Sequence, residues 1–426
     1  MIATTSPSPD LGDDTNGSGP KGDVGYLQWF VFGLFFIFGG ITSLNDVLVP
    51  KLKELFELNY FQAMLIQTAF FAAYFIVSLP AAALVQKVGY MRGAVVGLLI
   101  MMAGCLLFIP AAGAGLFAAF LGALFVLASG VTLVQVVANP LISMLGAPAT
   151  APSRLTFAQA FNSLGTTVFP YVGATIILGS LATVSATELS GAALTAYRAA
   201  EAAVITHAYI GIAVALAVVA LVVWLNRNRL FEEKAPTVGF LSAFNLLKQP
   251  RFAFGALGIF VYVGAEVAVA SLMTNYLMQA DTLALTPQHA GERLALYWGG
   301  ALVGRFIGAF VMRYVAPWKV LASVAVGAIA LIGLSVFTTG AVSGIALLSV
   351  GLFNAIMFPT IFTLASANLG KRAAEGSGII CMAIVGGAII PPLTGLMVDA
   401  TSLRVALIIP VFCYAVIALY ARYCRR

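Results

Sequence analysis

Long apolar runs dominate the chain, and polar residues gather mostly in short stretches between them. A helix needs roughly 20 apolar residues to cross the hydrocarbon layer of a membrane. Strands of membrane barrels alternate apolar and polar positions over about 10 residues, and these runs do not alternate. The pattern therefore predicts twelve membrane-spanning helices, at about 27–49, 60–86, 93–111, 114–145, 157–184, 203–225, 252–279, 293–313, 319–338, 342–367, 376–398 and 402–421.

The polar stretches predict how these spans are grouped. Residues 1–24 are polar and lack an apolar segment, so we expect a disordered cytoplasmic tail rather than a signal peptide. The longest internal polar stretch, 226–251, follows the sixth span and predicts a cytoplasmic linker. It separates an N-terminal six-helix half, 25–225, from a C-terminal six-helix half, 252–426. The expected fold class is an all-α polytopic membrane protein with twelve transmembrane helices in two pseudo-symmetric halves.

Short sequence patterns recur in the two halves. ANPLISMLG at 138–146 resembles FPTIFTLASANLG at 358–370. FNSLGTTVFPYVGATI at 161–176 resembles GSGIICMAIVGGAIIPPLTGLMV at 376–398, with Gly and Pro in similar places. Weak internal symmetry of this kind is typical of a transporter whose halves move about a central site.

Composition excludes several other classes of protein. Of the 426 residues 61% are hydrophobic and 9% are charged, against about 25% charged in a typical soluble domain. Four cysteines make no disulfide framework, and scattered basic residues form no nucleic-acid-binding patch despite a net charge of +6. There is no GxxxxGKS/T phosphate loop, no histidine with metal-ligand spacing and no Ser, His and Asp set. We therefore expect neither an enzyme, nor an ATP-driven pump, nor a metal site.

Lysine and arginine positions predict the orientation in the membrane. With the N-terminus inside, most of the 22 Lys and Arg residues fall in cytoplasmic segments, as the positive-inside rule requires. Both termini are therefore expected in the cytoplasm and the protein in the cytoplasmic (inner) membrane.

Seven motifs cover nearly the whole chain and carry a family resemblance. They are LNDVLVPKLKELFELNYFQAMLIQTAFFAAYF (44–75), VVANPLISMLG (136–146), LTFAQAFNSLG (155–165), YVGAEVAVAS (262–271), YWGGALVGRFIGAF (297–310), FNAIMFPTIFTLA (353–365) and GSGIICMAIVGGAIIPPLTG (376–395). In these motifs the chain resembles the major facilitator superfamily, in the branch that holds the L-fucose permease and the bacterial glucose/galactose and N-acetylglucosamine transporters. The general superfamily loop after the second span is degenerate here (LVQKVGYMRG, 84–93). The resemblance implies cation-coupled import of a hexose or aminohexose by alternating access.

Asp46, Glu266 and Arg305 lie inside predicted spans and need a partner or a purpose, because an ionisable residue costs roughly 2.5–3.5 kcal/mol at a span centre. Asp46 either caps a helix or pairs with Lys51, or it is a protonatable acid facing the cavity. The resemblance favours the second role, because the matching LND motif of the fucose permease carries the coupling acid. Glu266 is the second expected ion-coupling residue. Arg305 is expected to form a gate or a charge pair with Glu266, or to snorkel to the inner surface.

Isolated amides and one aromatic residue are the candidate sugar ligands. Gln135 stands where the fucose permease has a glutamate, and this departure keeps both proton and sodium open as the coupling ion. Amides also join helices in membranes at about 0.6 kcal/mol each, which is the alternative role. Trp298 is the expected aromatic plate, because it lies seven residues before Arg305 on the same helix face. The expected substrate-binding set is Asn45, Gln135, Asn139, Gln159, Asn162, Asn275, Trp298 and Asn354.

Two further classes of function compete with a sugar symporter. One is an antiporter or exporter of another small solute with the same fold, and the other is a membrane enzyme or non-transporting sensor. An antiporter cavity would be more apolar and richer in Met, whereas amides and acids suit a polyhydroxylated solute. The expected partners are a monosaccharide, a coupling cation and the lipid bilayer, without nucleic acid or a further cofactor, and the chain is expected to act as a monomer.

Overall fold

Helices make up nearly all of the described chain. The computed structural model describes residues 24–55, 60–114, 116–173, 191–228, 240–367 and 369–425, and no strand occurs within them. In this part of the chain nine spans are long and apolar enough to cross a membrane. Two shorter apolar stretches, Leu27–Ile41 and Tyr209–Leu225, belong to α1 and α6.

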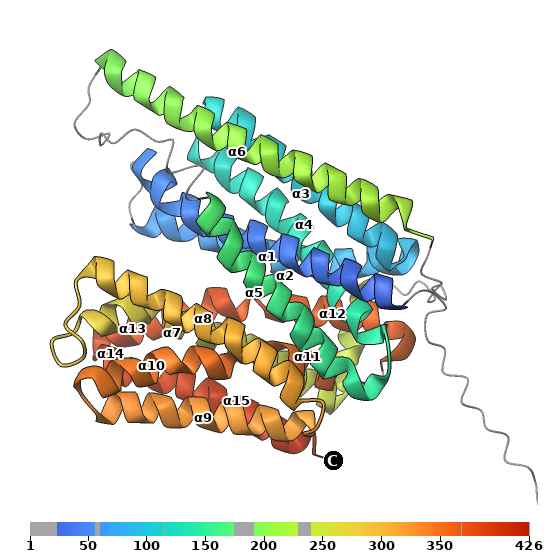
Figure 1. The fold of residues 1–426 in the computed structure, drawn as a ribbon, viewed down its shortest axis with the longest axis vertical. Helices are drawn as coiled ribbons and strands as arrows, with labels where there is room; N and C mark the ends of the chain where they lie inside the picture. Colours follow the sequence, from blue (N-terminus) through green and yellow to red (C-terminus); the bar gives the residue numbers. More distant parts are fainter. Residues whose placement is uncertain are drawn as a thin grey trace, which may run out of the picture.

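The first six helices form one group, drawn in blue to green in Figure 1. A single residue, Gly89, joins the second helix to the third, and its φ of 87° lies in the left-handed region that glycine adopts freely. The helices are α1 (Val24–Leu55), α2 (Tyr60–Val88), α3 (Tyr90–Ala114), α4 (Phe117–Met144), α5 (Ala151–Gly173) and α6 (Gly191–Leu225).

The remaining helices form a second group, drawn in yellow to red. Three of them begin with proline, whose missing N–H is unneeded in the first turn of a helix. These are α7 (Pro250–Met278), α8 (Pro287–Val311) and α9 (Pro317–Phe337). They are followed by α10 (Gly340–Asn354), α11 (Met357–Ser366), α12 (Ala373–Ala383), α13 (Gly386–Ala400), α14 (Leu403–Ala406) and α15 (Ile408–Tyr423). The short 3-10 segments are η1 (Pro148–Thr150), η4 (Phe240–Lys248) and η5 (Gly370–Arg372).

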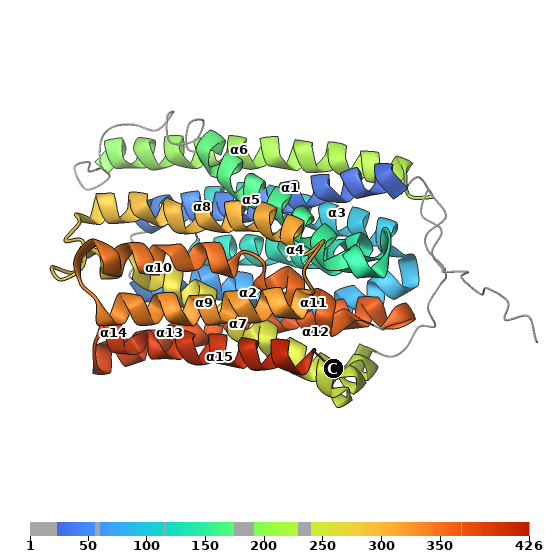
Figure 2. The same ribbon diagram turned by 60° about the horizontal axis from the view of Figure 1, so that its bottom comes forward.

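The last three spans are each broken into two helices, where the sequence pattern predicts continuous ones. Figure 2 shows α10 and α13 toward one end of the molecule and α11 and α12 toward the other. The break between α10 and α11 has a clear cause in Pro359, which has no N–H and cannot bond the carbonyl of Ala355 four residues earlier. That carbonyl is free to bond elsewhere.

The recurring sequence patterns have a structural counterpart at two glycines. A Cβ added at Gly165 of α5 would collide with the carbonyl oxygen of Phe36 in α1. A Cβ added at Gly386 of α13 would collide with the carbonyl oxygen of Phe260 in α7. In each half, therefore, the fifth span crosses the first at backbone contact, and each glycine precedes a proline by five residues.

A second pair of contacts repeats the same arrangement. Gln28 Nε2 of α1 donates to the carbonyl of Leu145 at the end of α4, at 2.6 Å. Arg251 Nε of α7 donates to the carbonyl of Leu364 near the end of α11, at 3.1 Å. A side chain at the start of each half thus holds a last-turn carbonyl that has no partner within its own helix.

The two groups meet along α2 and α4 against α12, and along α5 against α8 and α11. Gln86 Nε2 near the end of α2 donates to Glu375 Oε1 at the start of α12, at 2.8 Å. Ser153 Oγ at the start of α5 donates to the carbonyl of Ala309 near the end of α8, at 2.6 Å. These bonds lie at the end of the molecule that carries the C-terminus (Figure 1), which we call the closed end.

Gly386→Ala should destabilise the protein, because the added methyl group has to displace a backbone carbonyl. Overpacking of this kind costs about 1–3 kcal/mol. The matched control is Gly395→Ala in the same helix, where an added Cβ meets no atom within 4 Å. The measurement is the midpoint of thermal aggregation in detergent. Equal midpoints for the two variants would contradict the close crossing of α13 and α7.

Candidate functional site

A cavity of about 180 Å³ lies between the two halves, inward from the closed end. Its volume lies below the range of about 300–1,000 Å³ typical of ligand sites. The lining comes from α1, α2, α4 and α5 on one side and α7, α8, α11 and the α12–α13 break on the other. The lining residues are Phe38, Gly39, Phe70, Phe71, Tyr74, Gln135, Gln159, Asn162, Thr166, Tyr262, Val263, Glu266, Arg305, Phe358 and Ile384.

Three amides stand on the N-terminal wall of the cavity. Gln135 of α4 is buried and accepts a 2.8 Å hydrogen bond from the hydroxyl of Tyr74 in α2. This bond fixes the Gln135 oxygen and leaves its amide nitrogen as a donor to the cavity. Asn162 of α5 donates to the carbonyl of Phe35 at 3.3 Å. Gln159, one turn earlier, is buried beside it on the same helix face.

One carboxylate, Glu266 of α7, stands on the C-terminal wall. The hydroxyl of Tyr262, one turn earlier, donates to Glu266 Oε1 at 2.7 Å and also lies 3.1 Å from the carbonyl oxygen of Asn354. Behind this pair the Tyr297 hydroxyl accepts from Asn354 Nδ2 at 2.7 Å and donates to the backbone carbonyl of Glu266 at 3.2 Å. The acid is therefore held in a network that links α7, α8 and α10.

Arg305 of α8 joins the two halves. Its Nη1 donates to the carbonyl of Gln159, at 3.1 Å, and to the hydroxyl of Ser163, both in α5. Its Nε donates to the Ala355 carbonyl that Pro359 leaves free, at 3.3 Å. We call these contacts the Arg305 latch. The predicted charge pair with Glu266 does not form among the described residues. Both side chains line the cavity, but the hydrogen bonds of Arg305 all go to neutral oxygens.

Four of the predicted ligands do not line the cavity. Asn139 is fully buried, and neither of its polar side-chain atoms has a hydrogen-bond partner in the described chain. Asn354 is buried in the network behind Glu266. Asn275 is exposed, and Trp298 is 45% exposed with its ring edge-on to Tyr297.

These predictions differ from the structure because they considered only the helix face of each residue and not its position along the helix axis. Seven residues separate Trp298 from Arg305, which returns to the same face but moves about 10 Å along the helix axis. Asn275 lies still further from Glu266 along α7, and Asn139 is one turn from Gln135 toward the closed end. The cavity is short compared with a span, so residues on one face do not all reach it.

Two predicted residues, Asn45 and Asp46, lie outside the described side chains. Helix α1 runs through both positions. Their roles stay predictions.

Several lining residues were not predicted from the sequence. Tyr74, Phe38, Phe70, Phe71 and Phe358 supply most of the aromatic wall. Aromatic residues are frequent throughout these spans, so the sequence has no signal that separates a cavity aromatic from one in the core. An interruption such as Pro359 was the one available pointer to α11.

The arrangement suits a neutral polar solute with one apolar face. Amide groups and a carboxylate donate and accept hydrogen bonds from both halves, while phenyl rings cover the remaining wall. Because both halves contribute, a relative movement of the halves changes the cavity and its access together.

Comparisons with known proteins agree with this architecture. Residues 30–384 match the family described as Major Facilitator Superfamily. The chain is 49% identical to a glucose/galactose transporter of Brucella abortus over 91% of each chain. It is 34% identical to the L-fucose-proton symporter of Escherichia coli over 92% of this chain and 91% of that one. The crystal structure of the transporter FucP in the outward conformation matches with a TM-score of 0.87 and 33% identity, covering 94% and 99%. The predicted fold class and family resemblance are confirmed.

Arg305→Lys should loosen the closed end, because one ammonium group cannot replace a guanidinium that bonds both halves at once. Cys381 reports this opening, since Gly378, one turn before it in α12, packs against Ser78 and Ala82 of α2 and the thiol is buried. With the other three cysteines replaced by Ser, alkylation of Cys381 by N-ethylmaleimide should accelerate about fivefold or more.

The matched control is Arg293→Lys, an exposed position near the opposite end of α8. It should leave the alkylation rate of Cys381 unchanged. If both variants altered the rate equally, the latch would have no special role in closing the molecule.

Proposed function

Because this chain belongs to the major facilitator superfamily, we propose that it is a cation-coupled symporter that imports a hexose or aminohexose by alternating access. The observation that carries the proposal is the cavity shared by both halves, with three amides, a carboxylate and aromatic walls. A sugar presents hydroxyl groups around its rim and an apolar ring face, and these walls complement both. The proposed occupant is of the glucose/galactose type, which the 49% identity to a transporter of that name supports.

Asp46 and Glu266 are the proposed ion-coupling residues, with a proton or sodium as the ion. Glu266 is supported by its place on the cavity wall, where its carboxylate has a neutral hydrogen-bond donor and, within the described residues, no ion pair. A carboxylate held in that way is ready to take up a cation. Asp46 is supported by the LND motif alone.

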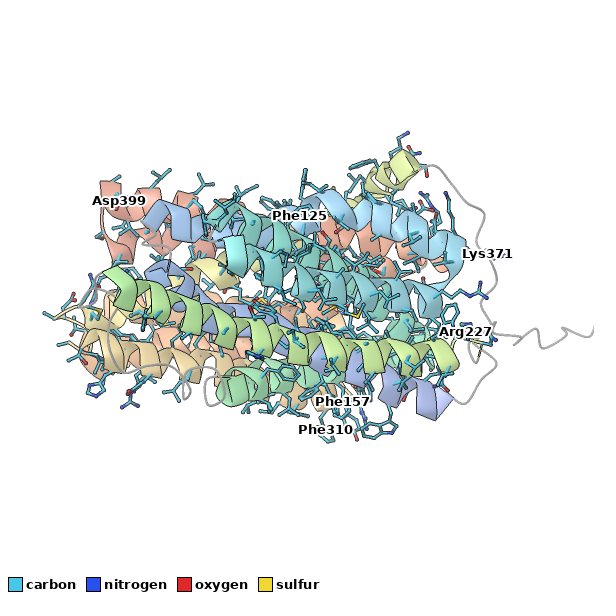
Figure 3. The ribbon with its side chains drawn as sticks, turned by 90° about the horizontal axis from the view of Figure 1, so that it is seen from above. Phe125, Phe157, Arg227, Phe310, Lys371 and Asp399 are labelled. Atoms are coloured by element: carbon cyan, nitrogen blue, oxygen red, sulfur yellow. The ribbon has the colours of Figure 1, made fainter. Side chains whose placement is uncertain are left out.

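The closed end is proposed to face the cytoplasm. Figure 3 shows Arg227 and Lys371 at one end of the molecule and Asp399 at the other. Basic residues at or just beyond the helix ends on the first side, among them Arg154, Arg313 and Arg422, follow the positive-inside rule. Both termini are then cytoplasmic, in the inner membrane of a bacterium. The closed cytoplasmic end, together with the similarity to FucP in the outward conformation, supports an outward conformation of this chain.

Both walls of the cavity come from one chain, so the protein is proposed to work as a monomer. The coupling ion is the one further partner that transport needs.

Transport by the purified protein in liposomes tests the proposal. Labelled glucose, galactose, fucose and N-acetylglucosamine are offered in turn with an imposed proton or sodium gradient. Accumulation of one of them above its external concentration is expected with one gradient only. Absence of uptake for all four sugars, in protein that binds none of them, would contradict the proposed function.

Gln135→Ala should weaken sugar binding, because truncation leaves a sugar hydroxyl without its partner. The loss is about 1–3 kcal/mol per buried group, or roughly five- to a hundredfold in Kd. Asn139→Ala is the matched control on the same helix and should leave Kd unchanged, since Asn139 does not reach the cavity. Isothermal titration of the two variants with the transported sugar measures both. An equal loss for both would place the sugar deeper in the N-terminal half.

Asp46→Asn should abolish uphill accumulation and preserve exchange of sugar down its own gradient. The neutral amide mimics the cation-neutralised acid, so the carrier still changes conformation but no longer responds to the gradient. Counterflow of labelled sugar measures exchange, and gradient-driven uptake measures coupling. Normal accumulation by this variant would leave the coupling role to Glu266.

A further inference from the structure

The Tyr262 hydroxyl has two acceptors but only one proton. Glu266 Oε1 lies 2.7 Å from it and the carbonyl oxygen of Asn354 lies 3.1 Å from it. One phenol hydroxyl donates one hydrogen bond, so it cannot serve both oxygens fully. An ionised carboxylate is the stronger acceptor, because charge-assisted hydrogen bonds are about twice as strong as neutral ones. A neutralised Glu266 releases the hydroxyl to Asn354.

The second acceptor belongs to the break between α10 and α11. Asn354 is the last residue of α10, and the next carbonyl, that of Ala355, has lost its helical partner to Pro359. Arg305 Nε donates to the Ala355 carbonyl at 3.3 Å. Adjacent carbonyls at one helix break are therefore held by Tyr262 and by Arg305.

Arg305 carries the connection into the other half through Gln159 and Ser163 of α5. A continuous set of contacts thus runs from the acid, through Tyr262 and the helix break, to the Arg305 latch. Each contact is a hydrogen bond of a described residue.

We propose that Tyr262 is a positioning residue that passes the charge state of Glu266 to the break between α10 and α11, and through it to the Arg305 latch. This inference rests on the proposed coupling role of Glu266. When a cation neutralises the acid, the Tyr262 hydroxyl turns to the Asn354 carbonyl. The break then repacks, Arg305 shifts with the Ala355 carbonyl, and its bonds to α5 weaken.

The other polar groups around Glu266 offer a second route by which its charge could act on the Arg305 latch. Arg305 and Tyr297 of α8 and Tyr414 of α15 are the titratable groups that face it from neighbouring described helices. Arg305 is the cation among them, so Glu266 would also attract it directly across the cavity. The two routes differ in one respect, because the direct route does not need the Tyr262 hydroxyl.

A mutant cycle distinguishes the two routes. The readout is the alkylation rate of Cys381 in lipid nanodiscs, without sugar, in protein whose other cysteines are replaced by Ser. Glu266→Gln should accelerate alkylation about fivefold or more, the lower end of typical coupling. In the Tyr262→Phe background the same change should alter the rate by less than about twofold, as expected when the sites are uncoupled.

Tyr297→Phe is the matched control background. It removes a buried hydroxyl from the same network, but one whose partners among the described residues are the backbone of Glu266 and the Asn354 side chain. The acceleration by Glu266→Gln should persist in it. Persistence in the Tyr262→Phe background as well would overturn the proposal in favour of direct attraction. Loss in both backgrounds, or no acceleration with Tyr262 present, would also overturn it.

A second variant keeps the test decisive if Tyr262→Phe does not fold. Glu266→Asp keeps the charge but withdraws the carboxylate from the hydroxyl, so it should accelerate alkylation as Glu266→Gln does. The direct route depends mainly on the charge, which this variant keeps, so it requires an acceleration well below that of Glu266→Gln, and that result would overturn the proposal. Because this readout needs neither sugar nor a gradient, it is independent of the uptake assay. If no sugar is taken up but the mutant cycle gives the expected alkylation rates, the result counts against sugar symport and not against the role of Tyr262.

Discussion

Hydrocarbon offers no water to an unpaired backbone group, and this constraint governs the whole molecule. It makes every described span helical, and it means that the backbone groups freed at an interruption must find partners, either in local 3-10-type bonds, as between α12 and α13, or in a side chain. The break between α10 and α11 is the clearest case, because Pro359 frees a carbonyl that Arg305 then bonds. The same guanidinium closes the contact with α5. A local backbone defect and the joining of the two halves therefore depend on one side chain.

Duplication supplies the framework, and small departures from symmetry supply the site. In each half an amide on the fourth span, five residues before a proline, bonds a tyrosine on the second span. In the N-terminal half this pair, Gln135 and Tyr74, lines the cavity. In the C-terminal half Asn354 and Tyr297 are fully buried, and Tyr262 with Glu266 lies in front of them. These two additional residues place an acid at the surface of the cavity and connect it by hydrogen bonds to the break between α10 and α11.

The sequence predicted those features of the candidate site that depend on which face of a helix a residue occupies. Gln159 and Asn162 share a face of α5, and both line the cavity. Glu266 and Arg305 were expected at the centre because charge is costly in a span, and both lie there. Trp298 and Asn139 satisfied the same rule of helical spacing and lie elsewhere, because that rule says nothing about depth. Tyr262 became significant only through its two acceptors.

The sequence by itself determined the number and extent of most spans, since the length and apolarity of each run are set by the thickness of the bilayer. Its recurring Gly and Pro positions also marked the duplication that the crossings at Gly165 and Gly386 display. Only the tertiary structure decided which polar side chains meet. The partners of Arg305 lie 50 to 146 residues away along the chain, and the choice of neutral oxygens over Glu266 depends on how the halves pack. Spacing within one helix contains no information on that packing, because it is set by contacts between helices.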